Sequence, residues 1–431
     1  MPDRIPWYRS DMNGTNFALA FDLGTTTLAA SLIVPATGQR LGLNGSLNPQ
    51  RRFGADVVSR LEAAVHSENV LKEMAALVRA ELLRLGRQLC ESNDVPWDAV
   101  RQVAIAGNPA MQHILLQLPV TTLAAPPYRP LSTAGKHLTA AGLGWPGSAA
   151  VYIFPMPGGF VGGDTVAFLY GQMTDMTPET SGPTLLLDMG TNGEMALHDG
   201  TTIWATSAAA GPAFEGGNLT CGMSALPGAI SSCTLDQDRI RLAVIGETNP
   251  IGICGSAAIE IVSELLRSGI VDATGRLLTA EEIPSNLATR IVSVDGEPAF
   301  SLYRDAKRSL VLTQGDIRQI QLAKGAIRAG MDVLSQRSRI HYKDLCHVIL
   351  TGSFGAVLRP EWLKSIGIFD ESMIQICRFV SEGALCGVER ALITGDGFSG
   401  AERLGSRFQV VPLSGTPLFE SAFLEQINFP R

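Results

Sequence analysis

Two short segments of the 431-residue sequence share a residue pattern that suits phosphate and metal binding. They are Asp22-Leu-Gly-Thr-Thr-Thr27 and Asp188-Met-Gly-Thr-Asn-Gly-Glu194, and each joins two apolar runs as a hairpin turn would. Glycine permits the tight turn, the following N–H groups and hydroxyls can face an anion, and the aspartate can hold Mg²⁺ directly or through water. One such segment alone is equally well an ordinary hairpin. The second copy favours two loops that clamp a triphosphate and its metal.

The two loops and a third segment supply most of the candidate site residues. In Phe160-Val-Gly-Gly-Asp-Thr-Val-Ala167, Asp164 could orient the attacking water or coordinate the metal, and the alternative is an N-cap aspartate. Glu194 is either a group that positions metal or water or a solvated hairpin carboxylate. The candidate catalytic residues are Asp22, Asp164, Asp188 and Glu194, of which Asp22 and Asp188 are also the candidate Mg²⁺ ligands. The candidate nucleotide-binding residues in these segments are Gly24, Thr25, Thr26, Thr27, Gly162, Gly163, Gly190, Thr191 and Asn192.

A glycine turn after a later apolar strand is the third part of the candidate nucleotide site. Leu350-Thr-Gly-Ser-Phe-Gly355 follows the strand expected at 347–350, and a glycine there would let a purine and ribose approach the backbone. Taken alone, the segment is an ordinary β-to-α turn. Its position after the two loops adds Gly352, Ser353 and Phe354 to the nucleotide-binding candidates.

Several other catalytic and binding patterns are missing from the sequence. It holds no G-x-x-x-x-G-K-[ST], no H-x-x-x-H and no G-x-S-x-G. Gly395-Asp-Gly-Phe-Ser-Gly400 matches G-x-G-x-x-G but follows a helix-like segment, so we interpret it as a loop and exclude a dinucleotide site. Net charge of −7 argues against nucleic-acid binding by phosphate neutralisation.

The cysteines indicate a reducing compartment. The seven are Cys90, Cys221, Cys233, Cys254, Cys346, Cys377 and Cys386, with no C-x-x-C pair among them. This spacing fits neither a disulfide framework nor a zinc ribbon, and a cytoplasmic protein is expected. Cys221 and Cys254 lie in glycine contexts, where a redox or iron–sulfur role competes with that of a buried structural thiol. Neither a signal peptide nor a membrane-spanning run is expected.

The composition and periodicity predict a globular α/β chain. Apolar residues make up 45% and charged residues 17%, which excludes a disordered protein. Strands are expected at 17–21, 28–34, 103–107, 185–187 and 347–350. Helices are expected at 56–91, 110–118, 256–268, 316–337 and 383–393, with Thr313 and Asp316 capping the fourth, and a loop at 124–150.

The repeated Asp-x-Gly-Thr pattern predicts two related lobes. We expect a lead-in over 1–15, a first lobe over 16–175, a linker over 176–184, a second lobe over 185–395 and a tail over 396–431. The tail is expected to hold a closing strand and a short helix.

The ordered set of motifs resembles the superfamily of actin-like ATPases, sugar kinases and heat-shock chaperones (ASKHA). In finer detail it resembles the ATPase domain of the reductive activators of corrinoid proteins, over about residues 17–394. The resembling segments begin Leu47-Asn-Pro-Gln-Arg-Arg, Ala106-Gly-Asn-Pro-Ala-Met, Ala209-Ala-Gly-Pro-Ala-Phe, Gly252-Ile-Cys-Gly-Ser and Thr313-Gln-Gly-Asp-Ile-Arg, the last reaching Lys324. The resemblance implies two RNase H-like lobes around a nucleotide cleft.

The resemblance also implies a function. It implies an Mg-dependent ATPase that restores an inactive Co(II) corrinoid protein to Co(I), with an electron from an iron–sulfur domain. By matching position, Asp22, Thr25, Thr26, Asp188, Gly190, Thr191 and Gly352 would carry the nucleotide, and Lys324 joins the ATP-binding candidates. Residues 207–228 would face the corrinoid partner, and the hydroxyl of Ser207 would approach the cobalt unless it is a buried loop serine.

The cysteines depart from this family pattern, in which activators carry their own ferredoxin module. No cysteine precedes Cys90 and none are clustered, so we expect no iron–sulfur cluster on this chain. The electron donor is then a separate ferredoxin-like chain, or the protein has no redox role. The expected partners are a corrinoid protein, that donor and, in a dimer, a second copy, without nucleic acid or membrane. A small-molecule kinase, with Asp164 as base, and a nucleotide-gated binding protein remain alternatives.

Overall fold

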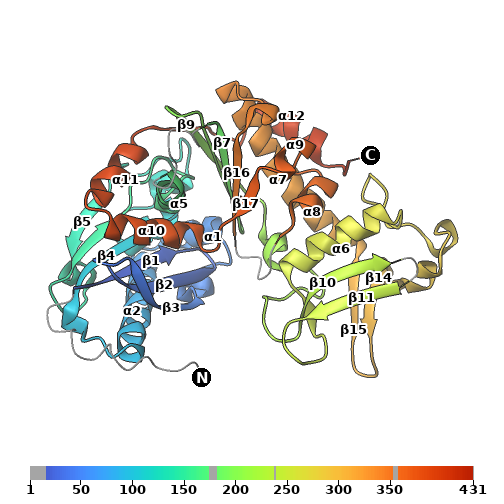
Figure 1. The fold of residues 1–431 in the computed structure, drawn as a ribbon, viewed down its shortest axis with the longest axis horizontal. Coiled ribbons are helices and arrows are strands. Elements are labelled where there is room, and N and C mark those ends of the chain that lie inside the picture. Colours follow the sequence, from blue (N-terminus) through green and yellow to red (C-terminus); the bar gives the residue numbers. More distant parts are fainter. Residues whose placement is uncertain (1–15, 174–181, 237–238, 353–357, 431) are drawn as a thin grey trace. The chain divides into compact units, whose positions relative to one another are not determined.

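The chain forms two compact units, and each unit consists of two separate stretches of the sequence. The computed structural model describes residues 16–430 except 174–181, 237–238 and 353–357. The first unit comprises the chain up to Thr180 together with Glu382–Val410, and the second comprises Ser181–Ser381 with Val411–Arg431 (Figure 1). The sequence analysis instead expected a second lobe over 185–395 and a tail over 396–431. Residues 382–410 span that expected boundary and belong to the first unit. The predicted linker lies largely outside the described residues.

The first unit is built on a mixed sheet with strand order β3-β2-β1-β4-β6-β5. β1 pairs antiparallel with β2 and parallel with β4, so the end of β1 lies between the ends of two neighbours. The strands of this unit are β1 (Phe17–Leu23), β2 (Thr27–Val34), β3 (Gln39–Leu47), β4 (Val100–Gly107), β5 (Lys136–Thr139), β6 (Ala150–Ile153) and β18 (Phe408–Val410).

Helices cover both faces of this sheet. Alternate residues of β1 face opposite sides of the sheet. On one side, Leu19 and Phe21 contact Gly86 of α2. On the other side, Ala20 is in register with Ser31, and the Ser31 hydroxyl donates a hydrogen bond to Glu389 of α10. The helices of this unit are α1 (Val57–His66), α2 (Glu68–Ser92), α3 (Pro109–Leu115), α4 (Thr121–Ala124), α5 (Gly163–Met173), α10 (Gly383–Ile393) and α11 (Gly397–Gly405).

Glycines let α5 and α10 pack at very short range. A Cβ on Gly387 would lie 1.7 Å from the carbonyl oxygen of Ala167, and one on Gly171 would lie 2.8 Å from Cα of Gly387. Side chains are therefore excluded at both positions. This packing is the physical reason why α10, which follows the second unit in sequence, belongs to the first.

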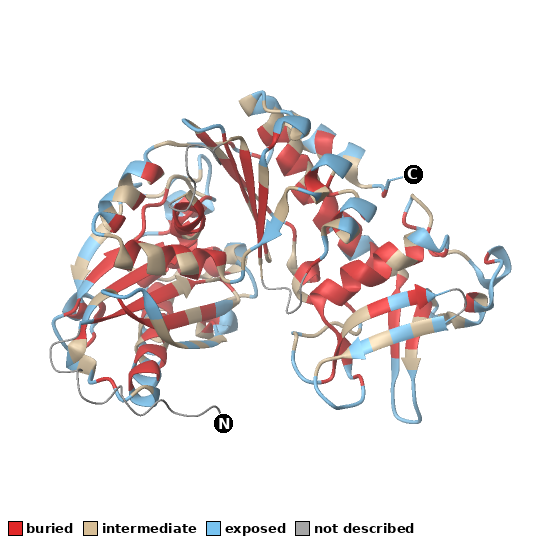
Figure 2. Ribbon diagram, in the orientation of Figure 1, coloured by how far each residue is buried: buried red, intermediate tan, exposed pale blue. Residues whose placement is uncertain are grey.

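The second unit has a central sheet in which β17, β16, β7, β8 and β9 are neighbours in that order. β7 pairs antiparallel with β8 and parallel with β16. These strands are β7 (Thr184–Met189), β8 (Gly193–His198), β9 (Ile203–Ala208), β16 (His347–Thr351) and β17 (Cys377–Phe379). Figure 2 shows that β7 and β16 are largely buried.

Two smaller sheets and five helices complete the second unit. One sheet has the order β11-β10-β12 and the other β13-β14-β15, and α6 packs on β10. Their strands are β10 (Ala229–Asp236), β11 (Arg239–Val244), β12 (Gly252–Ile253), β13 (Ile291–Val294), β14 (Glu297–Arg304) and β15 (Ser309–Thr313). The helices are α6 (Gly255–Arg267), α7 (Gln314–Ser338), α8 (Pro360–Ser365), α9 (Glu371–Ile374) and α12 (Pro417–Gln426).

Most of the elements expected from the sequence are present. The expected helix at 383–393 is α10, and Thr313 and Asp316 form a reciprocal capping box at the start of α7. The tail holds β18 and α12, the strand and short helix that were expected. Among the described residues, no helix has the length and apolar character needed to cross a bilayer.

Three expectations about local structure were wrong. The helix expected over 56–91 is two helices, because Ser67 is the N-cap of α2 and accepts a hydrogen bond from the amide of Val70. The region 124–150 is not all loop, since it contains β5 and the start of β6. The glycine-rich segment 395–400 is not a loop either, because α11 begins at Gly397.

Candidate functional site

Three turns of the first unit converge on the first phosphate loop. Asp22 ends β1, in register with Ala29 of β2 and Ala106 of β4, and is half-buried. A Cβ on Gly24 would lie 2.5 Å from the carbonyl oxygen of Thr27, so this turn requires glycine. A Cβ on Gly162 would lie 2.5 Å from Cα of Asn108, and Asn108 donates to Oγ1 of Thr25 at 2.8 Å. The Gly162–Asp164 turn and the Asn108 turn therefore lie against the loop.

Two fully buried polar side chains hold the loop from behind. Nδ2 of Asn48 donates to the carbonyl oxygen of Gly24 at 2.9 Å, and its backbone amide donates to that of Thr26 at 2.9 Å. Nη1 of Arg60 donates to the carbonyl oxygen of Thr25 at 2.7 Å, and its Nε donates to that of Gly54 at 2.9 Å. The carbonyl oxygens of Gly24, Thr25 and Thr26 are thus occupied from the protein side.

The Arg60 guanidinium is a cation without a paired carboxylate among the described residues. It has no solvent exposure, and its Nη2 is buried with no hydrogen-bond partner in that part of the chain. Burial lowers the pKa of Arg60 to about 10, and the charge of Asp56 offsets this only in part. A buried unpaired charge is costly unless something compensates it. A phosphate on the adjacent loop would provide that compensation.

Asp164 lies in the first turn of α5. Burial raises the pKa of Asp164 to about 6, although its Oδ1 accepts a hydrogen bond from the Thr165 amide at 2.7 Å that favours the charged form. A carboxyl with this pKa can accept a proton near neutral pH, which suits a group that activates water. The amide of Gly163 donates to Oε1 of Gln112 at 3.4 Å, so a side chain of α3 orients this turn.

In the second unit, three polar residues form one row across neighbouring strands. Asp188 of β7 is in register with Glu194 of β8, and Glu194 is in register with Ser207 of β9. Residues opposite one another in a sheet project from the same face. Oγ of Ser207 donates to Oε1 of Glu194 at 3.2 Å, and Thr351 of β16 lies beside Asp188. Ser207 is therefore a half-buried strand residue and not the loop serine of the alternative interpretation.

The neighbours of Glu194 show which face this row occupies. A Cβ on Gly193 would lie 2.8 Å from Cγ1 of Ile327, and Gly330 faces Met195. Gly193 and Met195 thus pack on α7, and Glu194 between them projects from the opposite face. The row is consequently on the face of the sheet away from α7.

A second carboxylate stands beside the second phosphate loop. Oγ1 of Thr191 donates to Oε2 of Glu215 at 2.5 Å, and Glu215 ends the 3₁₀ turn η5 (Pro212–Glu215). Burial raises the pKa of Glu215, and the hydrogen bond from Thr191 opposes that shift. A Cβ on Gly190 would meet Oε1 of Glu215 only at 3.7 Å, so open space remains over the loop. The amide of Gly190 donates to the carbonyl oxygen of Asn192 at 2.9 Å.

The remaining nucleotide-binding candidates have fewer contacts that tie them to either phosphate loop. Gly352 directly follows Thr351 and has a φ of 147°, a conformation that favours glycine. Ser353 and Phe354 lie outside the described residues. Lys324 lies on α7 beneath the C-terminal segment, so the structure does not bring it to the Asp188 row. Thr26 and Asn192 lie in their turns, and Thr27 is the first residue of β2.

The side chains of the two loops fit a magnesium–nucleotide complex. Among the residues that the structure describes, no group of three or more His, Cys, Asp or Glu is arranged to hold a metal ion. Mg²⁺ needs no such cage, because it is usually held by one or two carboxylates together with waters and substrate phosphates. Asp22 and Asp188, each one residue before the end of a strand that leads into a glycine turn, supply donors of that chemistry.

The sequence interpretation missed four polar residues that build the loops. Asn48, Arg60 and Asn108 support the first loop, and Glu215 accepts from the second. Asn48, Asn108 and Glu215 lie in segments that carry the family resemblance, which was the available signal. Arg60 lies outside those segments, in the amphipathic helix α1, where an arginine is usually exposed to solvent.

The comparisons with known proteins identify the family. Residues 182–431, more than half of the chain, match the family described as the C-terminal domain of RACo, the ASKHA domain. Residues 17–177 match the RACo middle region. The chain belongs to the RACo family. The residues between the two matches, 178–181, lie within the linker expected over 176–184.

Two curated relatives and one solved structure agree with this assignment. RamQ, a corrinoid activation enzyme from Eubacterium limosum, is 29% identical over 388 residues, which cover 88% of this chain and 64% of RamQ. A reductase of the Co(II) methylated amine-specific corrinoid protein from Methanosarcina barkeri is 24% identical over 385 residues, covering 81% and 65%. A solved reductive activator for a corrinoid, iron–sulfur protein is 27% identical with a TM-score of 0.85, covering 97% of this chain and 66% of its own. The chain spans less than two thirds of the length of these relatives.

The fold is therefore of the ASKHA type, as the sequence predicted. The high structural similarity to a reductive activator extends over nearly the whole chain. It confirms an α/β fold of the kind shared with sugar kinases and chaperone ATPases.

Proposed function

We propose that the chain binds Mg·ATP through its two phosphate loops and hydrolyses it. The support is the ASKHA fold together with the groups behind each loop: a buried guanidinium at the first and carboxylates at the second. Gly24, Thr25, Thr26 and Thr27 would bind phosphate oxygens through amides and hydroxyls. Thr191 and Asn192 would do so in the second loop, where Gly190 keeps the turn tight beside the phosphate. Asp22 and Asp188 would hold the magnesium, whose charge would stabilise the negative charge that develops on the phosphates.

In this proposal the carboxylates divide the chemical work. Asp164, with its pKa of about 6, accepts the proton of the attacking water. Glu194 orients that water or the metal's hydration shell from its place beside Asp188. Gly162 and Gly163 allow the Asp164 turn to lie close to the first loop. Gly352, after β16, lets the nucleoside approach the backbone.

We further propose that ATP turnover drives the reductive activation of a corrinoid protein. One electron from a donor reduces Co(II) to Co(I), and ATP binding and hydrolysis supply the driving force for this unfavourable transfer. The main support is the match to both RACo regions and the names of the relatives, all of which refer to corrinoid proteins. The methyltransferase systems in which corrinoid proteins work are the expected setting.

The electron donor in this proposal is an iron–sulfur protein on another chain. The support is the scatter of the cysteines, all seven of which are free thiols. Burial raises the pKa of Cys90 to about 11 and that of Cys233 to about 12, which makes both thiols poor ligands and weak nucleophiles. Free thiols also fit the expected reducing cytoplasm. The expected homodimer can be checked by light scattering.

Ser207 is the proposed contact to the corrinoid. The support is its half-buried position in the polar row, where its hydroxyl donates a hydrogen bond to Glu194. A Ser207→Ala variant should bind Mg·ATP normally but transfer the electron more slowly. Unchanged electron transfer in this variant would remove Ser207 from the proposal.

The decisive experiment titrates ATPase activity against a Co(II) corrinoid protein, with and without a reduced ferredoxin. The expected result is stimulation of hydrolysis by the corrinoid protein and appearance of the Co(I) absorption spectrum only when ATP and ferredoxin are both present. Hydrolysis without any Co(I) would contradict the redox part of the proposal while leaving the nucleotide part intact.

A small-molecule kinase is the second candidate function. The observation that favours it is Asp164, whose raised pKa equally suits a base toward a substrate hydroxyl. A phosphorylated product from a panel of sugars and small acids would support it. Nucleotide binding with undetectable hydrolysis, or filament formation, would instead indicate a nucleotide-gated binding protein.

A further inference from the structure

The second unit contains a cavity that is separate from the polar row on its sheet. It has a volume of about 600 Å³ and is lined by α7, by residues 364–371 and by the C-terminal segment 425–430. A cavity of this size is in the range that proteins use for small molecules. The polar row is on the face of β8 away from α7, whereas α7 itself lines the cavity, so the cavity is separate from the row.

A buried lysine lines this cavity. Lys324 is 1% exposed, and its Nζ donates to the backbone carbonyl oxygen of Asn428 and lies 5.5 Å from the ring centroid of Phe429. No carboxylate among the described residues lies within ion-pair distance of this ammonium group. Burial lowers the pKa of Lys324 to about 8, and the charge of Arg328 adds to that shift. Lysines are almost never buried to this degree without a partner of opposite charge.

The other cations around the cavity already have partners. Arg328 pairs with Asp332 at 3.0 Å and with Asp370 at 2.8 Å. Lys364 pairs with Glu371. Lys324 therefore differs from its neighbours, since an ammonium group has three N–H donors and a single backbone acceptor is accounted for.

The wall that carries Lys324 is fixed by contacts on both sides. Gln426 donates to Asp332 at 2.8 Å, Gln321 donates to the carbonyl oxygen of Ile427 at 3.2 Å, and the Phe429 amide donates to that of Ala273 at 2.8 Å. Gly367 has a φ of 84°, and a Cβ there would lie 3.5 Å from the lysine Nζ. The C-terminal segment thus holds the ammonium group at one place in the cavity.

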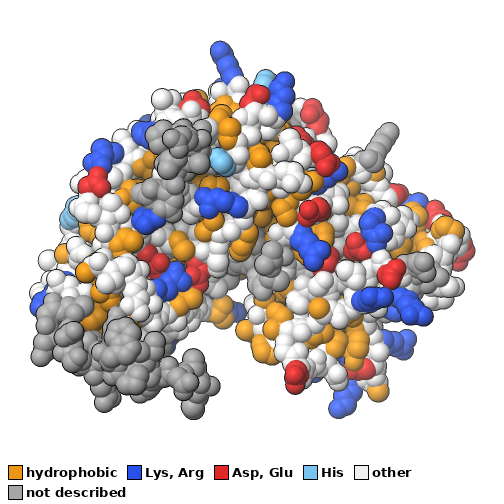
Figure 3. Space-filling view, viewed as in Figure 1, with side chains coloured by type: hydrophobic (Ala, Val, Ile, Leu, Met, Phe, Trp, Pro, Cys, Tyr) orange, Lys and Arg blue, Asp and Glu red, His pale blue; other side chains and the backbone are white. Residues whose placement is uncertain are grey.

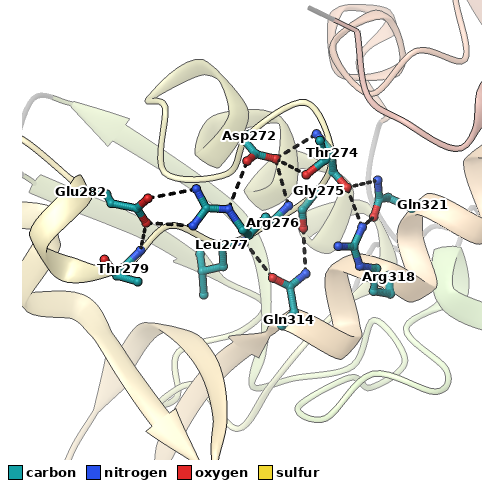
Figure 4. Close-up of polar contacts among 10 residues, drawn as sticks. All are labelled: Asp272, Thr274, Gly275, Arg276, Leu277, Thr279, Glu282, Gln314, Arg318 and Gln321. Carbon is teal, nitrogen blue, oxygen red and sulfur yellow. Dashed lines mark hydrogen bonds and ion pairs between the residues drawn. The ribbon is translucent and has the colours of Figure 1, made fainter.

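A network of hydrogen bonds ties the same wall to the loop that follows α6, residues 272–279 (Figure 4). Gln321 and Arg318 of α7 both donate to the carbonyl oxygen of Thr274, at 3.1 Å and 2.5 Å. Asp272 accepts from the amide of Thr274 at 2.8 Å and holds the turn in shape. Such a network fixes the position of α7 relative to the C-terminal segment. A ligand binds more tightly to walls that are already ordered, because binding then costs less conformational entropy.

We propose that this cavity binds a small organic anion, whose carboxylate or phosphate group pairs with the ammonium group of Lys324. An apolar part of the ligand would contact Phe369 and Phe429, which also line the cavity. Asp370, Glu371 and Glu425 stand around the same space and disfavour a highly charged ligand such as ATP. The site therefore selects a ligand with one or two negative charges. This inference does not depend on the proposed ATPase or corrinoid functions.

The test measures binding of two probes to the full chain without nucleotide. Benzoate and phenyl phosphate carry the same apolar ring with a carboxylate or a phosphate, and isothermal titration calorimetry gives the affinity of each. We expect at least one probe to bind, and Lys324→Met to weaken that binding by about tenfold or more, since a charge-assisted hydrogen bond is lost. The matched control is Lys307→Met, which removes an exposed lysine from the turn between β14 and β15 and should leave the affinity unchanged.

A second measurement needs no substitution and covers the case in which Lys324→Met fails to fold. Acetylation of the wild-type chain with acetic anhydride, followed by peptide mass spectrometry, should label Lys324, and the bound probe should protect it while Lys307 stays labelled. Absence of binding by both probes, equal binding by the Lys324→Met chain, or no protection of Lys324 would each overturn the proposal.

Discussion

The two phosphate-loop segments have the same sequence pattern, but the side chains behind them carry opposite charges. The first loop rests on the guanidinium of Arg60 and the amides of Asn48 and Asn108. The second loop rests on Glu215, with Glu194 in the same row as Asp188. Buried cations stabilise nearby anions, whereas carboxylates attract cations and polarise water.

This difference suggests a division of labour between two loops that the sequence presents as equivalent. The first would mainly bind phosphate oxygens, and the second would mainly position the metal and the water. Substitutions at the first loop should then affect binding, and substitutions at the second should affect the rate of the chemical step. Figure 3 shows no comparable separation of charge at the surface, where basic and acidic side chains are interspersed over the visible face of the second unit.

The largest effect is expected from the second loop. Asp188→Asn removes a metal-binding charge from a half-buried strand end, so kcat for Mg·ATP should fall by about 100-fold or more. The isosteric amide should keep the fold, which thermal unfolding can check. Asp344→Asn, at an exposed position of the same unit, is the matched control. A turnover equal to that of the wild type would eliminate Asp188 from the site.

The next effect is expected from the first loop. Arg60→Met removes the buried cation and its bonds to Thr25 and Gly54, so the KM for Mg·ATP should rise about tenfold, with a smaller change in kcat. Arg60→Lys should restore part of the affinity because it returns the charge. Steady-state kinetics measure both constants, and Arg101→Met at an exposed position of β4 is the control. A fall in kcat at constant KM would contradict the division between the loops.

The third test uses pH. If Asp164 acts as a base, the ATPase rate should rise with pH through about 6 as its carboxyl loses a proton, and Asp164→Asn should lack this rise. Stability should change in the opposite sense. The folded pKa of Asp164 is raised from 3.8, so the folded state binds this proton more tightly, and the wild type should lose stability relative to Asp164→Asn as pH rises from about 4 to 6. Parallel pH dependence of the two chains would exclude this role.

The smallest effect is expected from Thr191→Val. This substitution deletes the hydrogen bond from Thr191 to Glu215. Burial already raises the pKa of Glu215, and the loss of this hydrogen bond should raise the pKa further. The ATPase rate at acidic pH should fall by about threefold, in line with one lost hydrogen bond, and should recover as the pH rises. Thr289→Val, at an exposed threonine of the same unit, is the control for the loss of a hydroxyl. A loss that does not recover at higher pH would assign Thr191 to phosphate binding alone.

Local features of the sequence predicted much of the fold. The capping box of Thr313 and Asp316 reflects an interaction between near neighbours in the chain, and the helical periodicity of α10 is contained in one contiguous segment. The two hairpins at Asp22 and Asp188 were visible for the same reason, because the strands, the glycine and the polar turn are contiguous. The family resemblance then predicted the ASKHA fold.

The interactions that distinguish the two loops could not be predicted in the same way. Arg60 reaches the carbonyl of Thr25 from 35 residues away, and nothing in the sequence of α1 marks that arginine as buried. The row of Asp188, Glu194 and Ser207 depends on strand register, which periodicity alone does not fix. Ser67 was missed for a different reason: its role as an N-cap competes with a continuous apolar pattern across α1 and α2.

The close packing of α5 against α10 also bears on how the gene can be divided. The family boundary falls between residues 177 and 182, yet Glu382–Val410 belongs to the first unit. A fragment that encodes only residues 182–431 would leave α10 without α5, and would expose Leu385 and Val388 to water. Two separately expressed halves should therefore be poorly soluble alone and should reassociate when mixed, so that complementation between fragments, and not independent folding, is the behaviour to expect of this chain.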